Sequence, residues 1–310
     1  MSQRERIGFV GLGTMGEPMA ASLCAAGYAV TASVHRRRGA LERLHAQHGV
    51  REAADPAAVA AASDVVIVCV PDAPQVESVL FSAAGVVTGA NPGTLIVDTS
   101  TIGPGASRGF ADRLARQGLE FVDAPVSGGP ARAAAGTLAI MVGGDAAGFA
   151  RAEPVLRALG TPHHLGPVGM GETVKLVNQI IIGNVMIANA EALLFARRAG
   201  ADLDRVREVL ASATASNYVL EQWLPKTWLA GKLEGGFALD LLRKDLAAAL
   251  DTARAADYPM PATALAYQIY TSRSAQGDGA LDYSAVAKSY EWIAGDEAGP
   301  RRVRQEPGLQ

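Results

Sequence analysis

The feature that most constrains this chain is a glycine-rich turn that directly follows a buried strand at the start of the sequence. An apolar run at 7–10 leads into Gly11-Leu12-Gly13-Thr14-Met15-Gly16, a G-x-G-x-x-G pattern. The first glycine permits a tight turn, the second lets a pyrophosphate approach the backbone, and the third lets a helix pack on the strand. Helical spacing follows at Met19 and Leu23, and a second strand pattern ends near residue 34. This βαβ context predicts a dinucleotide site at a helix N-terminus, with an ordinary glycine turn as the alternative.

Strand and helix patterns alternate through the first half of the chain. We expect strands at 7–10, 29–34, 65–70, 94–98, 120–126 and 139–143, and helices at 18–26, 39–48, 56–62, 75–80 and 107–117. Several strands, such as 65–70, are continuous apolar runs, which is typical of a parallel sheet covered on both faces. The pattern predicts an α/β fold with an N-terminal, Rossmann-type doubly wound sheet.

After about Pro167 helical periodicity replaces the strand pattern. A long, mostly apolar helix is expected at 172–200, followed by helices at 203–213, 218–229, 239–256, 262–276 and 284–294. We therefore expect a dinucleotide-binding domain over 1–166. An all-α substrate and dimerisation domain is expected over 167–296, joined to it by the long helix, and a disordered tail over 297–310.

Composition and charge exclude several classes of protein. The 310 residues carry a formal net charge of −3, and the one sustained basic run is Arg36-Arg37-Arg38, so no nucleic-acid partner is expected. The apolar run at 180–190 is interrupted by polar residues and is too short to span a bilayer, so no membrane partner is expected. Two cysteines in apolar runs and the lack of a signal-peptide pattern predict a cytoplasmic location. No cluster has metal-ligand spacing, so we expect no metal.

The residues after the second strand bear on the choice of dinucleotide. NAD sites of this type usually carry an acid about 20 residues after the glycine turn, to hold the ribose 2′-hydroxyl. This chain has Ser33-Val34 followed by His35, Arg36 and Arg37 at that place. Guanidinium groups pair with a 2′-phosphate, so the sequence favours NADP. NAD is the alternative if these arginines form a solvated helix start.

Four further motifs follow the glycine turn in order. They are Asp98-Thr99-Ser100-Thr101-Ile102, Asp123-Ala124-Pro125-Val126-Ser127-Gly128-Gly129-Pro130, Gly166-x-x-Gly169-x-Gly171-x-x-x-Lys175-x-x-Asn178-Gln179, and Phe237-x-x-x-Leu241-x-x-Lys244-Asp245-Leu246. Over about residues 5–295 the chain resembles the β-hydroxyacid dehydrogenases. That family includes 3-hydroxyisobutyrate dehydrogenase, 2-hydroxy-3-oxopropionate (tartronate semialdehyde) reductase, glyoxylate and succinic semialdehyde reductases and, more distantly, 6-phosphogluconate dehydrogenase. The resemblance implies an NAD(P)-dependent oxidoreductase that interconverts a small 3-hydroxy carboxylate and its semialdehyde by hydride transfer.

Lys175 is the candidate general acid/base. Burying an ammonium group near the start of an apolar helix is costly unless the group is paired or its pKa falls. A lysine of lowered pKa can exchange a proton with a substrate oxygen, whereas a snorkelling surface lysine is the ordinary alternative. Asn178 lies three residues later on the same helix face and can orient the substrate or the lysine. The resemblance favours the catalytic reading for both residues.

The resemblance implies further binding residues. Ser127, Gly128 and Gly129 offer a hydroxyl and free N–H groups to a substrate carboxylate, with a plain glycine turn as the alternative. Gln179 stands where the family often has a second asparagine. The Asn178-Gln179 pair resembles the tartronate semialdehyde reductase branch more than hydroxyisobutyrate dehydrogenase. The predicted substrate-binding residues are Thr101, Ser127, Gly128, Gly129, Gln179, Phe237 and Asp245. The predicted cofactor-binding residues are Gly11, Leu12, Gly13, Thr14, Met15, Gly16, His35, Arg36, Arg37, Val70, Pro71, Thr101 and Lys244.

Several alternatives stay open. A semialdehyde, glyoxylate or sulfolactaldehyde reductase of the same family would share every motif. An imine reductase generally lacks the lysine, and a phosphosugar acid dehydrogenase would need a basic cluster in the helical half. A non-catalytic NADP-binding module would not need Lys175, Asn178 and Ser127 together. We expect a homodimer or homotetramer formed through the helical domain, acting on a small carboxylate or semialdehyde.

Overall fold

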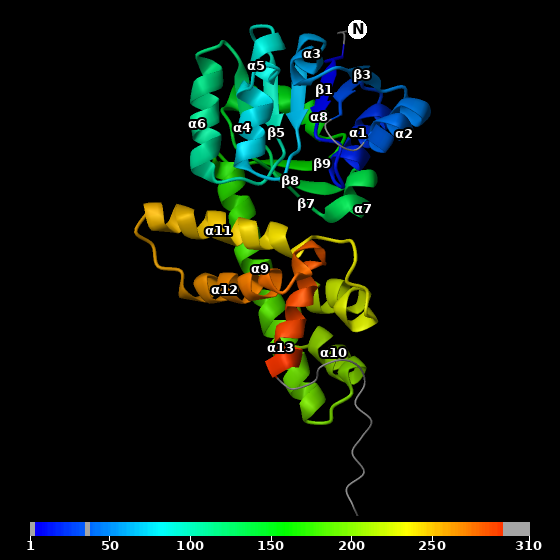
Figure 1. The fold of residues 1–310 in the computed structure, drawn as a ribbon, viewed down its shortest axis with the longest axis vertical. Coiled ribbons are helices and arrows are strands. Elements are labelled where there is room, and N and C mark those ends of the chain that lie inside the picture. The colour runs from blue at the N-terminus through cyan, green and yellow to red at the C-terminus, as the bar shows by residue number, and fades with distance from the viewer. Residues whose placement is uncertain (1–3, 35–37, 294–310) are drawn as a thin grey trace, which may run out of the picture. The chain divides into compact units, whose positions relative to one another are not determined.

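The computed structural model describes residues 4–34 and 38–293 (Figure 1). The chain divides into two compact units, one of Met1–Asn178 and Asp251–Tyr258, the other of Gln179–Leu250 and Pro259–Gln310. The boundary between Asn178 and Gln179 lies inside the long helix α9 (Met170–Arg198), so the first turns of that helix belong to the first unit. His35, Arg36 and Arg37, and the tail expected over 297–310, lie outside the described residues.

The first unit is built on a six-stranded parallel sheet with the strand order β3-β2-β1-β4-β5-β6. The strands are β1 (Ile7–Val10), β2 (Val30–Ser33), β3 (Arg51–Ala53), β4 (Val65–Val68), β5 (Leu95–Asp98) and β6 (Glu120–Asp123). Ile7 pairs with Val30 on one side and with Val65 on the other, so the chain order reverses between β1 and β4. The doubly wound sheet is confirmed. The edge strand β3 was missed because Arg51 and Glu52 are exposed and form no apolar run.

Helices cover both faces of this sheet, because alternate strand residues point to opposite sides (Figure 1). Ile7 and Phe9 pack with one set of helices, and Val66 and Val68 pack with the other. The first set is α1 (Gly16–Ala25), α2 (Arg38–His48) and α8 (Ala146–Leu156), and the second is α3 (Pro56–Ala61), α4 (Ala73–Phe81), α5 (Val86–Gly89) and α6 (Pro104–Ala115). The sequence patterns missed α5 and α8, which are respectively very short and interrupted by Pro154.

A second, three-stranded sheet follows in the same unit. It consists of β7 (Val126–Ser127), β8 (Leu138–Val142) and β9 (Gly160–His164), in that order, with α7 (Gly129–Ala134) between β7 and β8. The expected single strand over 120–126 is therefore wrong. It breaks at Ala124-Pro125, because proline has no N–H to donate to a strand ladder. The edge strand β9 was missed because it is largely exposed and contains Pro162.

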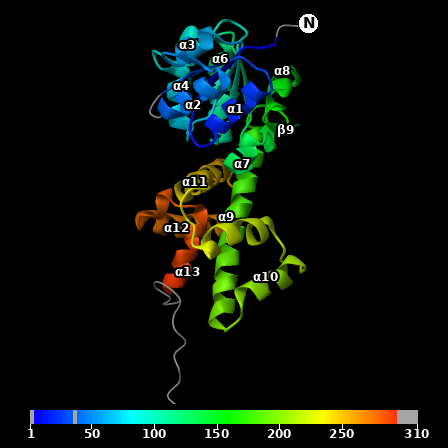
Figure 2. The ribbon, with the colours of Figure 1, turned by 90° about the vertical axis from the view of Figure 1, so that its right-hand side faces the viewer.

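The second unit is helical. It contains most of α9, α11 (Leu239–Ala255) up to Leu250, and the whole of α10 (Leu203–Ala211), α12 (Pro261–Ala275) and α13 (Ala287–Ile293). Figures 1 and 2 show α11 and α12 beside α9, and the core between them contains Met186, Leu242 and Tyr270. A single α-helix over 218–229 was wrong. A π-helical turn (Val219–Trp223) and two 3₁₀ turns (Leu224–Lys226 and Trp228–Ala230) replace it, because Pro225 cannot donate a helical hydrogen bond.

By length and composition alone, helix α9 is long and apolar enough to cross a membrane. The apolar run at 180–190, on which the expectation from the sequence rested, is too short to do so. A third of its most apolar window is buried, and core helices of globular proteins meet the same criterion. Apolar side chains of α9 are also exposed: Ile181 is 55% exposed and Phe195 is 75% exposed.

Candidate active site

The glycine turn after β1 has room for a ligand at one position only. Gly11 has a φ of +109°, and a Cβ there would lie 2.1 Å from the carbonyl oxygen of Cys69. A Cβ on Gly16 would lie 1.9 Å from the carbonyl oxygen of Gly11, so the turn itself requires both glycines. A Cβ on Gly13 would meet nothing within 4 Å. The chain's own packing does not require a glycine at position 13, and the open space fits the close approach of a pyrophosphate.

This turn lies where the strand order reverses between β1 and β4, at the carboxyl ends of the strands. Open α/β sheets bind ligands at such a point. Val70 and Pro71 follow β4, and the Val70 side chain would be 3.1 Å from a Cβ on Gly11. Thr14 is exposed and Met15 is half-buried, whereas Leu12 is only 8% exposed and belongs to the core. The backbone of Leu12, rather than its side chain, is therefore the part available to a cofactor.

The motif after β5 ties the ends of two neighbouring strands together. The Thr99 hydroxyl donates to the carbonyl oxygen of Val68 at 2.8 Å, and the Val70 amide donates to Ser100 Oγ at 3.0 Å. Thr101 is half-buried at the end of this motif. The next amide, that of Ile102, donates to Glu172 Oε2 of α9 at 3.0 Å. Thr101 is thereby held beside the start of α9.

Lys175 contacts the segment that leads to the predicted carboxylate-binding residues. Its side chain is buried (7% exposed), and Nζ donates to the carbonyl oxygen of Val126 at 2.9 Å. Val126 immediately precedes Ser127, the last residue of β7. Asn178 is half-buried one turn further along α9. The structure therefore brings Lys175 to the residue before Ser127, although the two segments are far apart in the sequence.

Ser127, Gly128 and Gly129 form a bend between β7 and α7. Gly128 has a φ of +140°, and a Cβ there would lie 2.7 Å from the side chain of Arg132. Gly129 has a φ of +73°, and a Cβ there would meet nothing within 4 Å. The bend is thus open at Gly129, where a small anion could reach backbone N–H groups.

In the second unit, the predicted residues Gln179, Lys244 and Asp245 meet one another. Gln179 and Asp245 are each 1% exposed, and Gln179 Nε2 donates to Asp245 Oδ2 at 2.6 Å. Lys244 Nζ lies 2.8 Å from Asp245 Oδ1. The buried carboxylate is therefore held by an amide and an ammonium group.

Phe237 is positioned by a buried carboxylate that the sequence patterns missed. Asp282 is 0% exposed and accepts the Phe237 amide at 3.1 Å through Oδ2, while its Oδ1 accepts the Trp223 indole N–H and the Ser284 amide, each at 3.0 Å. The Phe237 ring lies edge-on to Tyr283 with centroids 6.1 Å apart. The signal that could have pointed to Asp282 is an acid between apolar residues, Leu281 and Tyr283.

Two further buried acids in the first unit were also missed as individual residues. Asp123 and Glu172 are each 0% exposed, and Asp123 accepts the amides of Gly169 and Glu172 at 2.7 and 2.9 Å. Burial raises the pKa of the Asp123 carboxyl, and these backbone N–H groups oppose that shift. The signal available was an acid at the end of an apolar strand.

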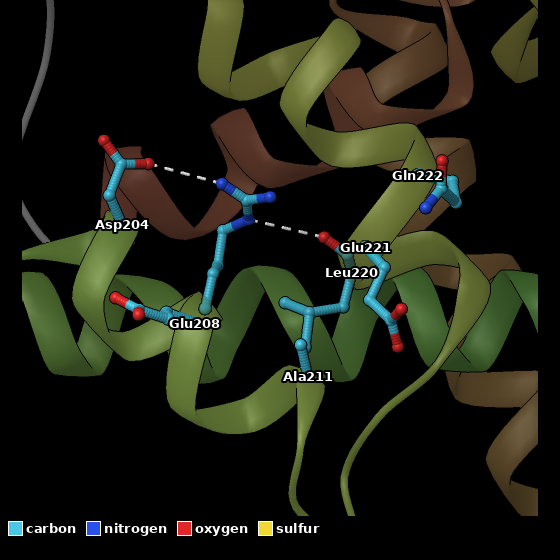
Figure 3. Close-up of a pocket in the computed structure, with 7 residues that line it drawn as sticks. Asp204, Glu208, Ala211, Leu220, Glu221 and Gln222 are labelled. Atoms are coloured by element: carbon cyan, nitrogen blue, oxygen red, sulfur yellow. Dashed lines mark hydrogen bonds and ion pairs between the residues drawn. The ribbon is translucent and has the colours of Figure 1, made fainter.

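A separate depression lies on α10 and the π-helical turn (Figure 3). Its volume is about 380 Å³, and it is lined by Asp204, Arg207, Glu208, Ala211, Leu220, Glu221 and Gln222. Arg207 crosses it, donating to Asp204 at 3.3 Å and to the carbonyl oxygen of Leu220 at 3.4 Å. It contains none of the predicted site residues, and we assign it no part in the chemistry.

Neither metal ligation nor thiol chemistry finds support in the described ranges. Residues 4–34 and 38–293 contain no group of three or more His, Cys, Asp or Glu side chains placed to hold a metal. Cys24 and Cys69 are free thiols. Burial raises the pKa of Cys69 to about 11, so this thiol is protonated at neutral pH.

The glycine turn, its place in the sheet and the helical second unit define a Rossmann-type NAD(P)-dependent oxidoreductase. Residues 6–177 match the family of the NAD binding domain of 6-phosphogluconate dehydrogenase. Residues 169–290 match the family described as NAD-binding of NADP-dependent 3-hydroxyisobutyrate dehydrogenase. The chain belongs to the β-hydroxyacid dehydrogenase (3-hydroxyisobutyrate dehydrogenase) family.

Individual relatives agree with this assignment. A 2-(hydroxymethyl)glutarate dehydrogenase of Eubacterium barkeri is 38% identical over 296 residues, which cover 95% of this chain and 98% of the relative. A 2-hydroxy-3-oxopropionate reductase of Escherichia coli is 39% identical over 290 residues, 93% of this chain and 98% of the relative. The solved 3-hydroxyisobutyrate dehydrogenase of Mycobacterium tuberculosis with L-serine is 32% identical, with a TM-score of 0.84 over 93% of this chain and 99% of that one.

Proposed function

We propose that this enzyme interconverts a small 3-hydroxy carboxylate and its semialdehyde, with Lys175 as the general acid/base. The observation that carries the proposal is the 2.9 Å hydrogen bond from Lys175 Nζ to the carbonyl oxygen of Val126, directly before Ser127. This bond supports the proposal, because the ammonium group then lies beside the residue before Ser127, and a glycine-rich bend of this kind can hold a carboxylate. The names of the relatives, 2-hydroxy-3-oxopropionate reductase and 3-hydroxyisobutyrate dehydrogenase, fit a substrate of that kind.

The protein groups divide the work between binding and proton transfer. The Ser127 hydroxyl and the amides of Gly128 and Gly129 hold the substrate carboxylate. In reduction, the Lys175 ammonium gives a proton to the carbonyl oxygen; in oxidation, the neutral amine takes the proton from the hydroxyl. The dinucleotide, bound at the Gly11–Gly16 turn, supplies or accepts the hydride. Asn178 orients the substrate or the lysine from the same helix face.

Residues of the second unit complete the proposed set. Gln179 and Asp245 bind substrate together with Phe237, and Lys244 binds the cofactor. Thr101 serves substrate and cofactor. These assignments rest on the resemblance to the family and on the Gln179–Asp245–Lys244 contacts.

We propose NADP as the preferred cofactor, with NAD as the alternative. Arg36 and Arg37 stand where NAD-specific sites carry an acid, and a guanidinium group complements a 2′-phosphate. His35 adds a further polar group there.

We also propose that the enzyme is a cytoplasmic homodimer or homotetramer. The apolar side chains exposed on α9, such as Ile181 and Phe195, would be covered by a second copy rather than by lipid. Light scattering on the purified protein in detergent-free buffer tests this proposal. A monodisperse dimer or tetramer supports it, and a monomer, or a protein that needs detergent, contradicts it.

A spectrophotometric screen tests the function. Tartronate, methylmalonate and succinic semialdehydes, glyoxylate and sulfolactaldehyde are each offered with NADPH and with NADH. We expect NADPH oxidation with at least one of them. A preference for NADH of roughly tenfold in kcat/KM would overturn the cofactor proposal. Turnover of cyclic imines without any turnover of semialdehydes would overturn the substrate class and favour an imine reductase.

A further inference from the structure

Asp123 lies at the junction of the two sheets in the first unit, and both its backbone and its side chain are hydrogen-bonded. It ends β6, its amide and carbonyl both pair with Gly143 after β8, and its side chain is 0% exposed. A Cβ on Gly143 would lie 2.5 Å from Asp123 Oδ1, and one on Gly171 would lie 2.8 Å from Oδ2. The Asp123 carboxylate is therefore in close contact with the backbone of two glycines, Gly143 and Gly171.

This carboxylate holds the first turn of α9. Oδ1 accepts the Gly169 amide at 2.7 Å, and Oδ2 accepts the Glu172 amide at 2.9 Å. The first amides of a helix have no partners inside the helix, and a negative charge there is favoured by the helix dipole. Both oxygens are used, so the helix is fixed in rotation as well as along its axis.

A second bond joins the same two segments one turn further along. Lys175 is three residues after Glu172, and Val126 is three residues after Asp123. The Lys175 ammonium donates to the carbonyl oxygen of Val126 at 2.9 Å. The Asp123–Glu172 bond and the Lys175–Val126 bond therefore close a small ring through α9 and the 123–126 segment. A third bond, from the Ile102 amide to Glu172 Oε2, ties the same helical turn to the residue after Thr101.

We propose that Asp123 is a positioning residue for the reaction, which sets the place of the Lys175 ammonium by anchoring the first turn of α9. This inference rests on the proposed role of Lys175. Lys175 lies on the helix whose first backbone amides are bound by the Asp123 carboxylate, next to the segment that ends in Ser127. A shift of about 1 Å in a catalytic group can lower the rate about a hundredfold, so the anchor matters for the rate and not only for folding.

Asp145 provides the matched comparison inside the same unit. Its Oδ1 accepts the Gly148 amide at 2.7 Å and caps α8, which carries none of the predicted site residues. Asp145→Asn therefore alters a helix cap of the same chemistry away from Lys175. Asp123→Asn puts an amide NH₂ against a backbone N–H and breaks one of the two anchoring bonds.

The test is steady-state kinetics against pH for the wild type, Asp123→Asn, Asp145→Asn and Lys175→Ala, together with thermal unfolding of each. For Asp123→Asn we expect kcat to fall about 10- to 100-fold with the NADPH KM within about twofold. We also expect the pH limb that depends on Lys175 to move, because the surroundings of the ammonium group change when the first turn of α9 is no longer anchored. Asp145→Asn should keep kcat and the pH profile and change the melting temperature little, because asparagine keeps the Oδ1 acceptor and caps a helix about as well as aspartate.

The outcomes separate this inference from the proposed function. If Lys175→Ala keeps near wild-type turnover, the proton-transfer role of Lys175 fails. If Lys175→Ala is inactive but Asp123→Asn behaves like Asp145→Asn, the role of Asp123 alone is wrong. If Asp123→Asn does not fold, Asp123→Ser, which keeps one acceptor oxygen and introduces no amide, takes its place with the same expected kcat loss and pH shift.

Discussion

The ammonium group of Lys175 donates a 2.9 Å hydrogen bond to the carbonyl oxygen of Val126, across a sequence separation of 49 residues. This bond joins the helix that carries the proposed acid/base to the strand that ends in Ser127. A buried ammonium group needs such a partner, because an unpaired charge in the interior is strongly unfavourable. Because of this bond, Lys175 contributes to the stability of the fold as well as to the proposed proton transfer. The stability of each Lys175 variant must therefore be measured together with its activity.

The glycine turn allows a clean separation of folding from cofactor binding. Gly13→Ala should leave the melting temperature nearly unchanged, because a Cβ there meets nothing within 4 Å, but it should raise the NADPH dissociation constant by filling space meant for phosphate. Gly11→Ala should destabilise the protein, because its φ is +109° and its Cβ would lie 2.1 Å from Cys69 O. Calorimetric titration and thermal unfolding check both variants. An equal loss of stability in Gly13→Ala and Gly11→Ala would contradict the conclusion that the space beside Gly13 is open and available to the cofactor phosphate.

Ser127→Ala tests the carboxylate-binding bend. Removing one hydroxyl that binds a charged group costs about 1.5–3 kcal/mol, so kcat/KM for the semialdehyde acid should fall by roughly 10- to 100-fold. The NADPH KM should stay close to the wild-type value. As a control, the corresponding aldehyde without a carboxylate should be a poor substrate of both the wild type and Ser127→Ala. Its kcat/KM should be similar for the two proteins. A Ser127→Ala enzyme with unchanged kcat/KM would remove Ser127 from the site.

The cofactor proposal depends on Arg36 and Arg37. Replacing both with alanine should lower kcat/KM with NADPH by at least roughly tenfold while changing kcat/KM with NADH little, because only NADPH carries the 2′-phosphate. Arg205→Ala serves as the control, since this side chain lies on α10 and is 82% exposed. Equal losses with both cofactors would show that the two arginines do not read the phosphate.

Asp282 should be important for the stability of the second unit. Asp282→Asn turns one acceptor oxygen into a donor facing the Phe237 amide or the Trp223 and Ser284 N–H groups, which should cost about 1–3 kcal/mol of unfolding free energy. Asp204→Asn is the control, because the Asp204 side chain is 94% exposed and should change stability by less than about 0.5 kcal/mol. Denaturant unfolding measures both. Similar midpoints for the two variants would contradict the structural role of Asp282.

The sequence predicted the helices and strands whose residues form a clear local pattern of apolar residues or glycines. The glycine turn and the continuous apolar strands specify a doubly wound sheet, and the long run after Met170 specifies α9. Strand β9 and the break at Pro125 were missed, since exposed edge strands lack an apolar run and a single proline redirects a chain between two sheets.

The candidate site was only partly predictable for the same reason. Lys175 and Ser127 stand out as residue types in unusual places. The bond between Lys175 and Val126, and the anchoring of α9 by Asp123, depend on tertiary contacts between segments some 50 residues apart, and no local pattern encodes them. Gln179 and Asp245 were both predicted from their motifs, but the hydrogen bond between them depends on the packing of the second unit and was not predicted.

The most direct test of the central claim is the turnover of Lys175→Ala with NADPH and the semialdehyde that the wild type reduces best, measured from pH 6 to pH 10, with NADPH binding and thermal unfolding as controls. General acid–base catalysis by one side chain contributes about 10²–10⁴-fold, so we expect kcat to fall by that factor, with NADPH still bound and the wild-type pH limb lost. Near wild-type turnover with the same pH profile would contradict the assignment of Lys175 as the acid/base.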